Sequence, residues 1–132
     1  MMNPVVHFEM PYRDRERAAR FYAAAFGWKH QMTGPEMGNY VVVTTAESDA
    51  KNGAPAGAIN GGMFEFKPNW PDQYPGVVIA VEDMGAAMTR VTRAGGEVLG
   101  APMLIPTVGD YVAFRDTEGN RHSMLKPLPM QQ

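Results

Sequence analysis

The chain contains no cysteine, which excludes disulfide bonds and thiolate chemistry. It has no excess of basic residues, since 12 Lys and Arg stand against 14 Asp and Glu, and no basic stripe is present to neutralise phosphates. We therefore expect no nucleic-acid partner. No apolar run approaches the roughly 20 residues of a membrane span, and the segment MMNPVVHF lacks the pattern of a signal peptide. These absences favour a cytoplasmic protein with no membrane partner.

The first part of the chain has the pattern of a strand, a helix and three further strands. Alternation over Val5–Met10 predicts a strand that Pro11 ends. Asp14 is a suitable N-cap for a helix that runs to about Phe26, and Gly27 supplies its stop. Strand patterns then cover residues 28–32, 40–45 and 58–66, with a polar loop over 47–57. Within the last of these strands, Gly61-Gly62 indicates a bulge or a close backbone approach.

The same order of patterns starts again after KPNWPDQYPG, a proline-rich linker at residues 67–76. An apolar strand over 77–81 precedes a helix capped by Asp83, and strands follow at 97–99, 111–115 and 121–126. Residues 102–109 remain between the strands, where they would form either a mobile lid or a static crossing between modules. The pattern predicts an α+β domain of two βαβββ modules, at about 4–66 and 77–128.

The motifs of both halves resemble the vicinal oxygen chelate superfamily, which includes glyoxalase I, extradiol dioxygenases and bleomycin resistance proteins. The helix segment DRERAARFYAAAFGW is similar to the family pattern after the first strand, and VEDMG…RAGGEV…RDTEGN is similar to the second module. INGGM, PMLIPTVGDY and RDTEGN look most like a subgroup described as related to lactoylglutathione lyase. Thr117 stands where the family usually has Pro. The resemblance implies two curled sheets around a concave cavity, and a homodimer.

Metal-using members of the superfamily hold a divalent ion with four His, Gln or Glu side chains in this cavity. By resemblance, His7 matches the first ligand position, and Glu65 is the best match for the second, with Met63 as a competing register. The third position falls on Gly76 or Val77, and the fourth on Ser123. Two of the four positions are therefore matched, so any divalent metal would be held weakly, and we do not expect a tightly bound catalytic ion.

The alternation places His7 and Glu9 on one face, so a His–carboxylate pair is expected in the cavity with Glu65 nearby. A neighbouring carboxylate raises the pKa of a histidine and orients its ring, which suits a general base for proton abstraction next to a carbonyl. The alternative is that His7 is an inherited ligand position that now serves as a hydrogen-bonded cavity residue. His30 and His122 are expected at the surface.

Three aromatic residues, Tyr40, Trp70 and Tyr111, are candidates to line the cavity, or else to pack the sheet or a dimer contact. Arg115 would either clamp an anionic ligand group or pair with an acid such as Asp116 or Glu118.

Two functions follow from these residues and the resemblance. One is a lyase- or isomerase-type enzyme that acts on a small carbonyl or hydroxy compound, with His7, Glu65 and Glu9 in the catalytic roles. The other is a metal-free protein that binds a small molecule or an antibiotic, for which a shaped cavity with a few polar anchors suffices.

Overall fold

The computed structural model describes residues 2–46 and 58–129, so the predicted loop at 47–57 lies outside the described residues. The chain divides into two compact units. The first unit comprises His7–Pro75, and the second comprises Met1–Val6 together with Gly76–Gln132.

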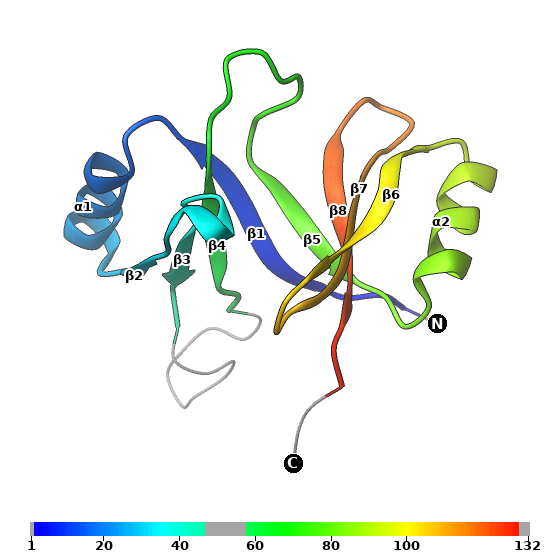
Figure 1. Ribbon diagram of the computed structural model, residues 1–132, viewed down its shortest axis with the longest axis horizontal. Helices are drawn as coiled ribbons and strands as arrows, with labels where there is room; N and C mark the ends of the chain where they lie inside the picture. The colour runs from blue at the N-terminus through cyan, green and yellow to red at the C-terminus, as the bar shows by residue number, and fades with distance from the viewer. Residues whose placement is uncertain (1, 47–57, 130–132) are drawn as a thin grey trace. The chain divides into compact units, whose positions relative to one another are not determined.

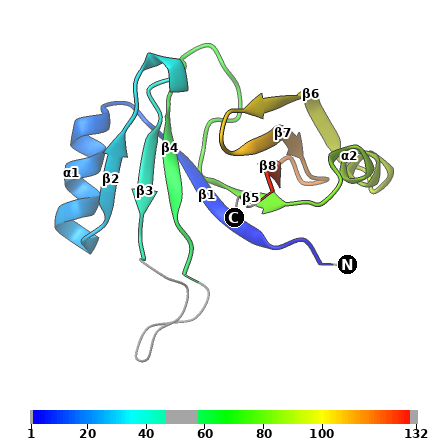
Figure 2. The ribbon, with the colours of Figure 1, turned by 60° about the horizontal axis from the view of Figure 1, so that its bottom comes forward.

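The described residues of the first unit form four strands, one α-helix and a short 3-10 helix (Figure 1). Its strands lie in the order β2-β3-β4-β1, and Figure 2 shows them as neighbouring arrows with the helix alongside. β1 and β4 pair in parallel, whereas β3 is antiparallel to both β2 and β4. The elements are β1 (Val5–Tyr12), α1 (Arg15–Phe26), β2 (Lys29–Met32), η1 (Pro35–Met37), β3 (Val41–Thr44) and β4 (Gly61–Glu65).

Both ends of α1 follow from local chemistry, as the sequence predicted. The Asp14 carboxylate accepts a hydrogen bond from the Arg17 backbone N–H at 3.0 Å, which satisfies one of the free donors of the first turn. Gly27 adopts a φ of 73°, the left-handed conformation that ends many helices.

The core of the first unit lies between its sheet and α1. Its buried members are Tyr12, Val41, Val43 and Met63, and Ala18 and Tyr22 of α1 pack against them. Phe8 and Met10 of β1 join the same cluster. Because side chains alternate along a strand, His7 and Glu9 lie on the opposite face of the sheet, away from α1.

Pro11 does not end β1, which was predicted to stop at Met10 and instead runs to Tyr12. The Phe8 N–H donates to Asn60 O, and Tyr12 O accepts from the Phe66 N–H, so alternate residues of β1 bond toward β4. The nitrogen of Pro11 points the other way, and its missing N–H therefore costs no hydrogen bond to β4.

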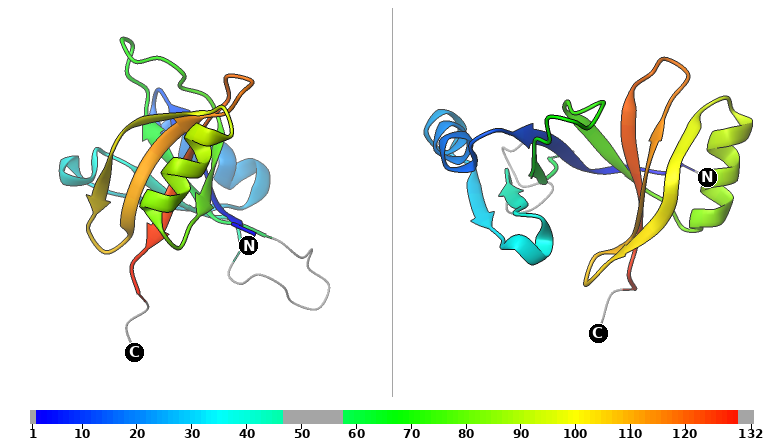
Figure 3. Two further views of the ribbon diagram at one scale, coloured as in Figure 1. Left: turned by 90° about the vertical axis from the view of Figure 1, so that its right-hand side faces the viewer. Right: turned by 45° about the horizontal axis from the view of Figure 1, so that its top comes forward.

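The second unit repeats the order of strand, helix and three strands. Its strands lie in the order β5-β8-β7-β6, and Figure 3 shows α2 alongside β6. The core consists of Val81, Met84, Ala87, Val112, Phe114 and Met124, from α2 and the sheet. The elements are β5 (Gly76–Ala80), α2 (Met84–Arg93), β6 (Glu97–Ile105), β7 (Gly109–Arg115) and β8 (Arg121–Pro127).

Residues 102–109 do not cross between the modules, because they lie in a hairpin within the second module. β6 extends from Glu97 to Ile105 and pairs with β7, so residues 102–105 lie in one arm of a hairpin and residues 106–108 form its turn. The pairing shifts register between Leu99 and Met103, next to Gly100 at a φ of 102°. This irregularity resembles a β-bulge, which interrupts the alternation that a sequence pattern depends on.

The predicted α+β class is confirmed, because each module has the element order βαβββ: β1-α1-β2-β3-β4 and then β5-α2-β6-β7-β8.

Candidate functional site

His7, Glu9 and Tyr40 form a hydrogen-bonded cluster on the face of the first unit that lies away from α1. The Tyr40 Oη atom is 3.0 Å from His7 Nε2 and donates to Glu9 Oε2 at 3.0 Å. β1 supplies His7 and Glu9, and Tyr40 immediately precedes β3. All three residues are half-buried, so each side chain is ordered by its partners and still reaches the surface.

The two adjacent glycines of β4 allow aromatic rings to lie against both faces of the strand. A Cβ atom on Gly61 would lie 2.5 Å from the Phe8 ring, and one on Gly62 would lie 2.0 Å from Tyr40 Oη. At Gly61 the close approach that the sequence indicated involves both the ring and the backbone oxygen of Phe8, each 2.5 Å from the Cβ position, and at Gly62 it involves the side chain of Tyr40 on the opposite face.

The pKa of His7 is lowered, contrary to the expectation from its neighbouring carboxylate. Burial of the ring is the larger cause, because it disfavours the charged imidazolium, and the charge of Glu9 acts in the opposite direction. The ring is therefore poised as a neutral imidazole, which is the form that accepts a proton.

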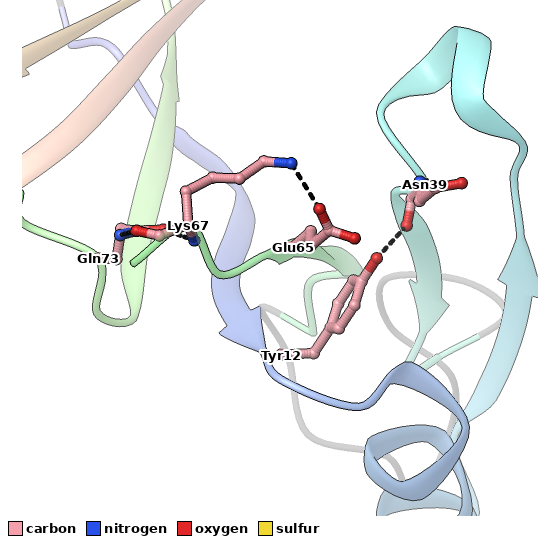
Figure 4. A network of polar contacts seen from close by, with 5 residues as sticks. All are labelled: Tyr12, Asn39, Glu65, Lys67 and Gln73. Atoms are coloured by element: carbon pink, nitrogen blue, oxygen red, sulfur yellow. Dashed lines mark hydrogen bonds and ion pairs between the residues drawn. The ribbon is translucent and has the colours of Figure 1, made fainter. Parts of the chain in front are cut away.

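Glu65 does not lie near His7, so that expectation was wrong. Glu65 pairs with Tyr12, five residues beyond His7 and about 16 Å along the strand at the usual rise per residue. It also shares the face of Met63, the core face, whereas His7 lies on the other. Figure 4 shows Glu65 beside Lys67, with which it forms an ion pair at 2.5 Å.

The residues around Glu65, at the end of β1, form hydrogen bonds that hold the neighbouring backbone in place. Tyr12 Oη donates to Asn39 O at 2.7 Å (Figure 4). Burial, followed by the charge of Glu65, raises the pKa of the Tyr12 hydroxyl. Gln73 accepts from the Lys67 N–H and donates to Lys67 O, both at 2.6 Å, and so closes the segment after β4 into a loop.

Trp70 lies in this loop and is 63% exposed. Its backbone N–H donates to Lys67 O, and its carbonyl accepts from Gln73 Nε2. The structure thus places Trp70 on a surface loop of the first unit, with its side chain largely open to solvent.

Tyr111 and Ser123 pair with each other in the second unit. Ser123 is buried and donates to Tyr111 Oη at 2.5 Å. Both side chains lie on the sheet face away from α2, since Val112 and Met124, their neighbours in sequence, belong to the core beneath that helix.

Arg115 contacts Glu97, the residue opposite it on β6, with 2.6 Å between Nη1 and Oε1. The acids that the sequence suggested as its partners, Asp116 and Glu118, lie in the following turn.

The two remaining histidines are half-buried, so each is only partly exposed at the surface. His30 Nε2 is buried without a hydrogen-bond partner among the described residues. His122 Nδ1 accepts from the Val77 N–H at 3.1 Å, and its ring packs near Phe114.

The four positions carried over from the superfamily do not fit a divalent metal. His7 Nε2 is engaged by the Tyr40 hydroxyl, and Glu65 lies on the other face of its sheet. Gly76 has no side chain, and Ser123 is a hydroxyl already paired with Tyr111. Across residues 2–46 and 58–129, no group of three or more His, Cys, Asp or Glu side chains could hold an ion.

The sequence predicted His7 and Glu9 as a pair and gave Tyr40 as a candidate cavity aromatic, but it missed that Tyr40 joins the other two. Gly62 was also missed as a site residue. The signal available for it was the glycine pair within an apolar strand, which indicates that something approaches the backbone closely.

Comparison with known proteins identifies the family. A family model described as bleomycin resistance protein-like N-terminal matches residues 5–46. A glyoxylase-like domain-containing protein of Didymella fabae is 34% identical over 119 residues, which is 88% of this chain and 88% of that protein. The chain belongs to the glyoxalase and bleomycin resistance superfamily, as its motifs predicted.

Other relatives are longer than this chain. The anthracycline biosynthesis protein DnrV of Streptomyces peucetius is 32% identical over 120 residues, which is 85% of this chain and 42% of DnrV. Two mycobacterial relatives are matched over 40% of their own length. The chain thus spans about two fifths of these curated relatives.

Among solved structures, the Streptomyces coelicolor methylmalonyl-CoA epimerase in complex with 2-nitronate-propionyl-CoA matches with a TM-score of 0.67. The match covers 98% of this chain and 100% of the epimerase at 16% identity, which establishes a shared fold. Neither α1 nor α2 of the described chain is long and apolar enough to cross a membrane.

Proposed function

We propose that this chain is an enzyme that moves a proton at the carbon next to a carbonyl group of a small molecule, with His7 as the general base. The observation that supports it best is the chain of hydrogen bonds from His7 through Tyr40 to Glu9, on a half-buried imidazole that burial keeps neutral. Such a histidine can accept a proton, and its partners can stabilise the positive charge that results.

The proposed step transfers a proton and an electron pair and needs no oxidant or reductant. The imidazole takes the proton from the carbon, and the electron pair of the C–H bond moves into the carbonyl to give an enolate. Return of the proton from the His7 imidazolium to this carbon restores the substrate. A proton taken from water on the opposite face gives the inverted configuration, and the imidazolium then releases its own proton to water. Where the carbon carries a hydroxyl group, return of the His7 proton to the neighbouring carbon of the enediolate gives an isomer. The substrate class, a small carbonyl or hydroxy compound, and the relation to lactoylglutathione lyase are part of this proposal.

The proposal is tested by proton exchange, which can be followed whatever product the enzyme forms. The protein is incubated in D₂O with S-lactoylglutathione, methylmalonyl-CoA and a 2-hydroxyketone, and deuterium at the carbon next to the carbonyl is followed by NMR. We expect exchange above the protein-free rate for at least one compound. In His7→Gln the rate should fall by about 100-fold or more, the usual contribution of a general base.

His122→Gln is the matched control, because His122 belongs to the second unit and its substitute keeps an acceptor for the Val77 N–H. Its exchange rate should equal that of the unaltered protein. The proposal fails if none of the three compounds exchanges, or if His7→Gln exchanges as fast as the control.

A second candidate is a protein that binds and sequesters a small molecule. One finding favours it: the family model that matches residues 5–46, the segment that carries His7, Glu9 and Tyr40, is described as bleomycin resistance protein-like. Titration with bleomycin and with an anthracycline, followed by calorimetry, tests this function. Saturable binding that His7→Gln weakens, in a protein without exchange activity, would establish it over the enzyme.

We also propose a homodimer, on the basis of the family resemblance, and a location in the cytoplasm, on the basis of the sequence pattern. Light scattering on the purified protein should give twice the 14.5 kDa mass of the chain. A mass of one chain at micromolar concentration would exclude the dimer.

A further inference from the structure

We propose that Tyr40 is a positioning residue that holds the proton of His7 on Nε2 and leaves Nδ1 as the basic atom, and that Gly62 is the residue that allows it to do so. The inference rests on the proposed function for its catalytic meaning. It goes further in naming the basic nitrogen and the two residues that select it.

The direction of the hydrogen bonds follows from the donors that each group has. A hydroxyl carries one hydrogen, and a carboxylate can only accept. The Tyr40 hydroxyl therefore donates its hydrogen to Glu9 Oε2. Toward His7 it can therefore only accept, and His7 Nε2, at 3.0 Å, must be the protonated nitrogen. A neutral imidazole has one N–H, so the lone pair available for a proton is on Nδ1.

Hydrogen bonds fix the backbone of Tyr40, and they therefore fix the point from which its side chain extends. The Tyr40 carbonyl accepts from the Thr33 N–H at 3.0 Å and from Thr33 Oγ1 at 2.6 Å, and the Tyr40 N–H donates to Met37 O. Arg15 Nη1 donates in turn to Thr33 O at 2.8 Å. The next residue, Val41, is fully buried in the core. The phenol can therefore move only by rotating about its side-chain bonds.

The hydroxyl end of the Tyr40 side chain lies directly against Gly62. Gly62 pairs with Glu9 on β1 and with Val42 on β3, so it is the central position of this face. A Cβ atom there would lie 2.0 Å from Tyr40 Oη, 2.1 Å from Cζ and 2.2 Å from Cε1. Even the methyl group of alanine would thus displace the hydroxyl from its place between His7 and Glu9.

The position of the proton is measured by ¹⁵N NMR of the histidine rings, which requires no substrate. We expect the neutral His7 ring to carry its proton on Nε2, with that N–H exchanging slowly with water. In Tyr40→Phe, which keeps the ring over Gly62, the slow exchange should be lost. A wild-type ring protonated on Nδ1, or an N–H unaffected by Tyr40→Phe, would overturn the inference.

The role of Gly62 is measured with a double-mutant cycle in urea denaturation. Gly62→Ala should lower the unfolding midpoint and abolish the slow His7 N–H, whereas Gly62→Ala in a Tyr40→Ala background should have little effect on the midpoint. Gly85→Ala is the control, since Gly85 lies in α2 and its Cβ atom would have only an ordinary contact at 3.6 Å. An equal cost of Gly62→Ala in both backgrounds would remove Gly62 from the inference.

Activity separates this inference from the proposed function. If exchange at carbon is found, Tyr40→Phe should lower kcat more than tenfold and leave KM within about twofold, because Tyr40 acts through His7 and not on the substrate. If no exchange is found, the NMR and denaturation results still decide whether Tyr40 and Gly62 set the tautomer. A change in KM alone would make Tyr40 a substrate-binding residue and refute its positioning role.

Discussion

Two polar side chains in the first unit differ in whether their buried atoms have a hydrogen-bond partner among the described residues. Tyr12 is 5% exposed, and its hydroxyl is satisfied by the Asn39 carbonyl at 2.7 Å. His30 lies opposite Val43, on the core face of β2, and its Nε2 atom is buried without a partner among the described residues. An unpaired buried nitrogen costs free energy in the neutral ring, and protonation of the same ring costs more.

His30 should make the protein less stable in mild acid. Burial lowers its pKa in the folded state below the 6.5 of the unfolded state, so the unfolded chain binds more protons as the pH falls through this window. The free energy of unfolding should therefore decrease as the pH drops below about 6.5, until the lowered pKa of His30 is passed.

The test compares the unaltered protein with His30→Leu by urea denaturation at pH 7 and pH 5. The variant should lose less stability between the two values, with a contribution from His7 remaining in both proteins because burial lowers its pKa as well. A variant with the same pH dependence as the unaltered protein would show that His30 titrates normally in the fold.

At the scale of elements, the features that the sequence predicted well are those fixed by local chemistry. α1 begins after Asp14 and ends at Gly27, as its caps required. The features predicted poorly depend on pairing with a distant strand. The extension of β6 to Ile105 is set by its register with β7, and a proline within β1 is tolerated because its nitrogen points away from β4.

The candidate site divides in the same way. Alternation alone placed His7 and Glu9 on one face, because the period of a strand is local. That Tyr40 would join them depends on the pairing of β3 with β4 and on the absence of a side chain at Gly62. Glu65 was predicted on the wrong face of the sheet. Side chains alternate along a strand, so an error of one residue in β4 moves a side chain to the other face.

At the scale of the whole molecule, each unit has an apolar core of its own. The buried cluster of the first unit includes Val41, that of the second includes Val112, and the two clusters share no residue. Both valines are essentially buried, at 0% and 2% exposure. Truncations at these two sites should therefore act independently on stability, since additivity holds for positions without shared partners.

Val41→Ala and Val112→Ala should each lower the free energy of unfolding by about 2 kcal/mol, from the lost apolar burial and the cavity left behind. The double variant should show the sum to within about 0.5 kcal/mol. Urea denaturation, followed by circular dichroism, gives the free energy of unfolding of the unaltered protein, both single variants and the double variant. The unfolding curve shows either one transition or a separate transition for each unit, and the shifts are measured in either case. A coupling energy above about 1 kcal/mol would mean that the two cores respond to each other and cannot be treated as separate.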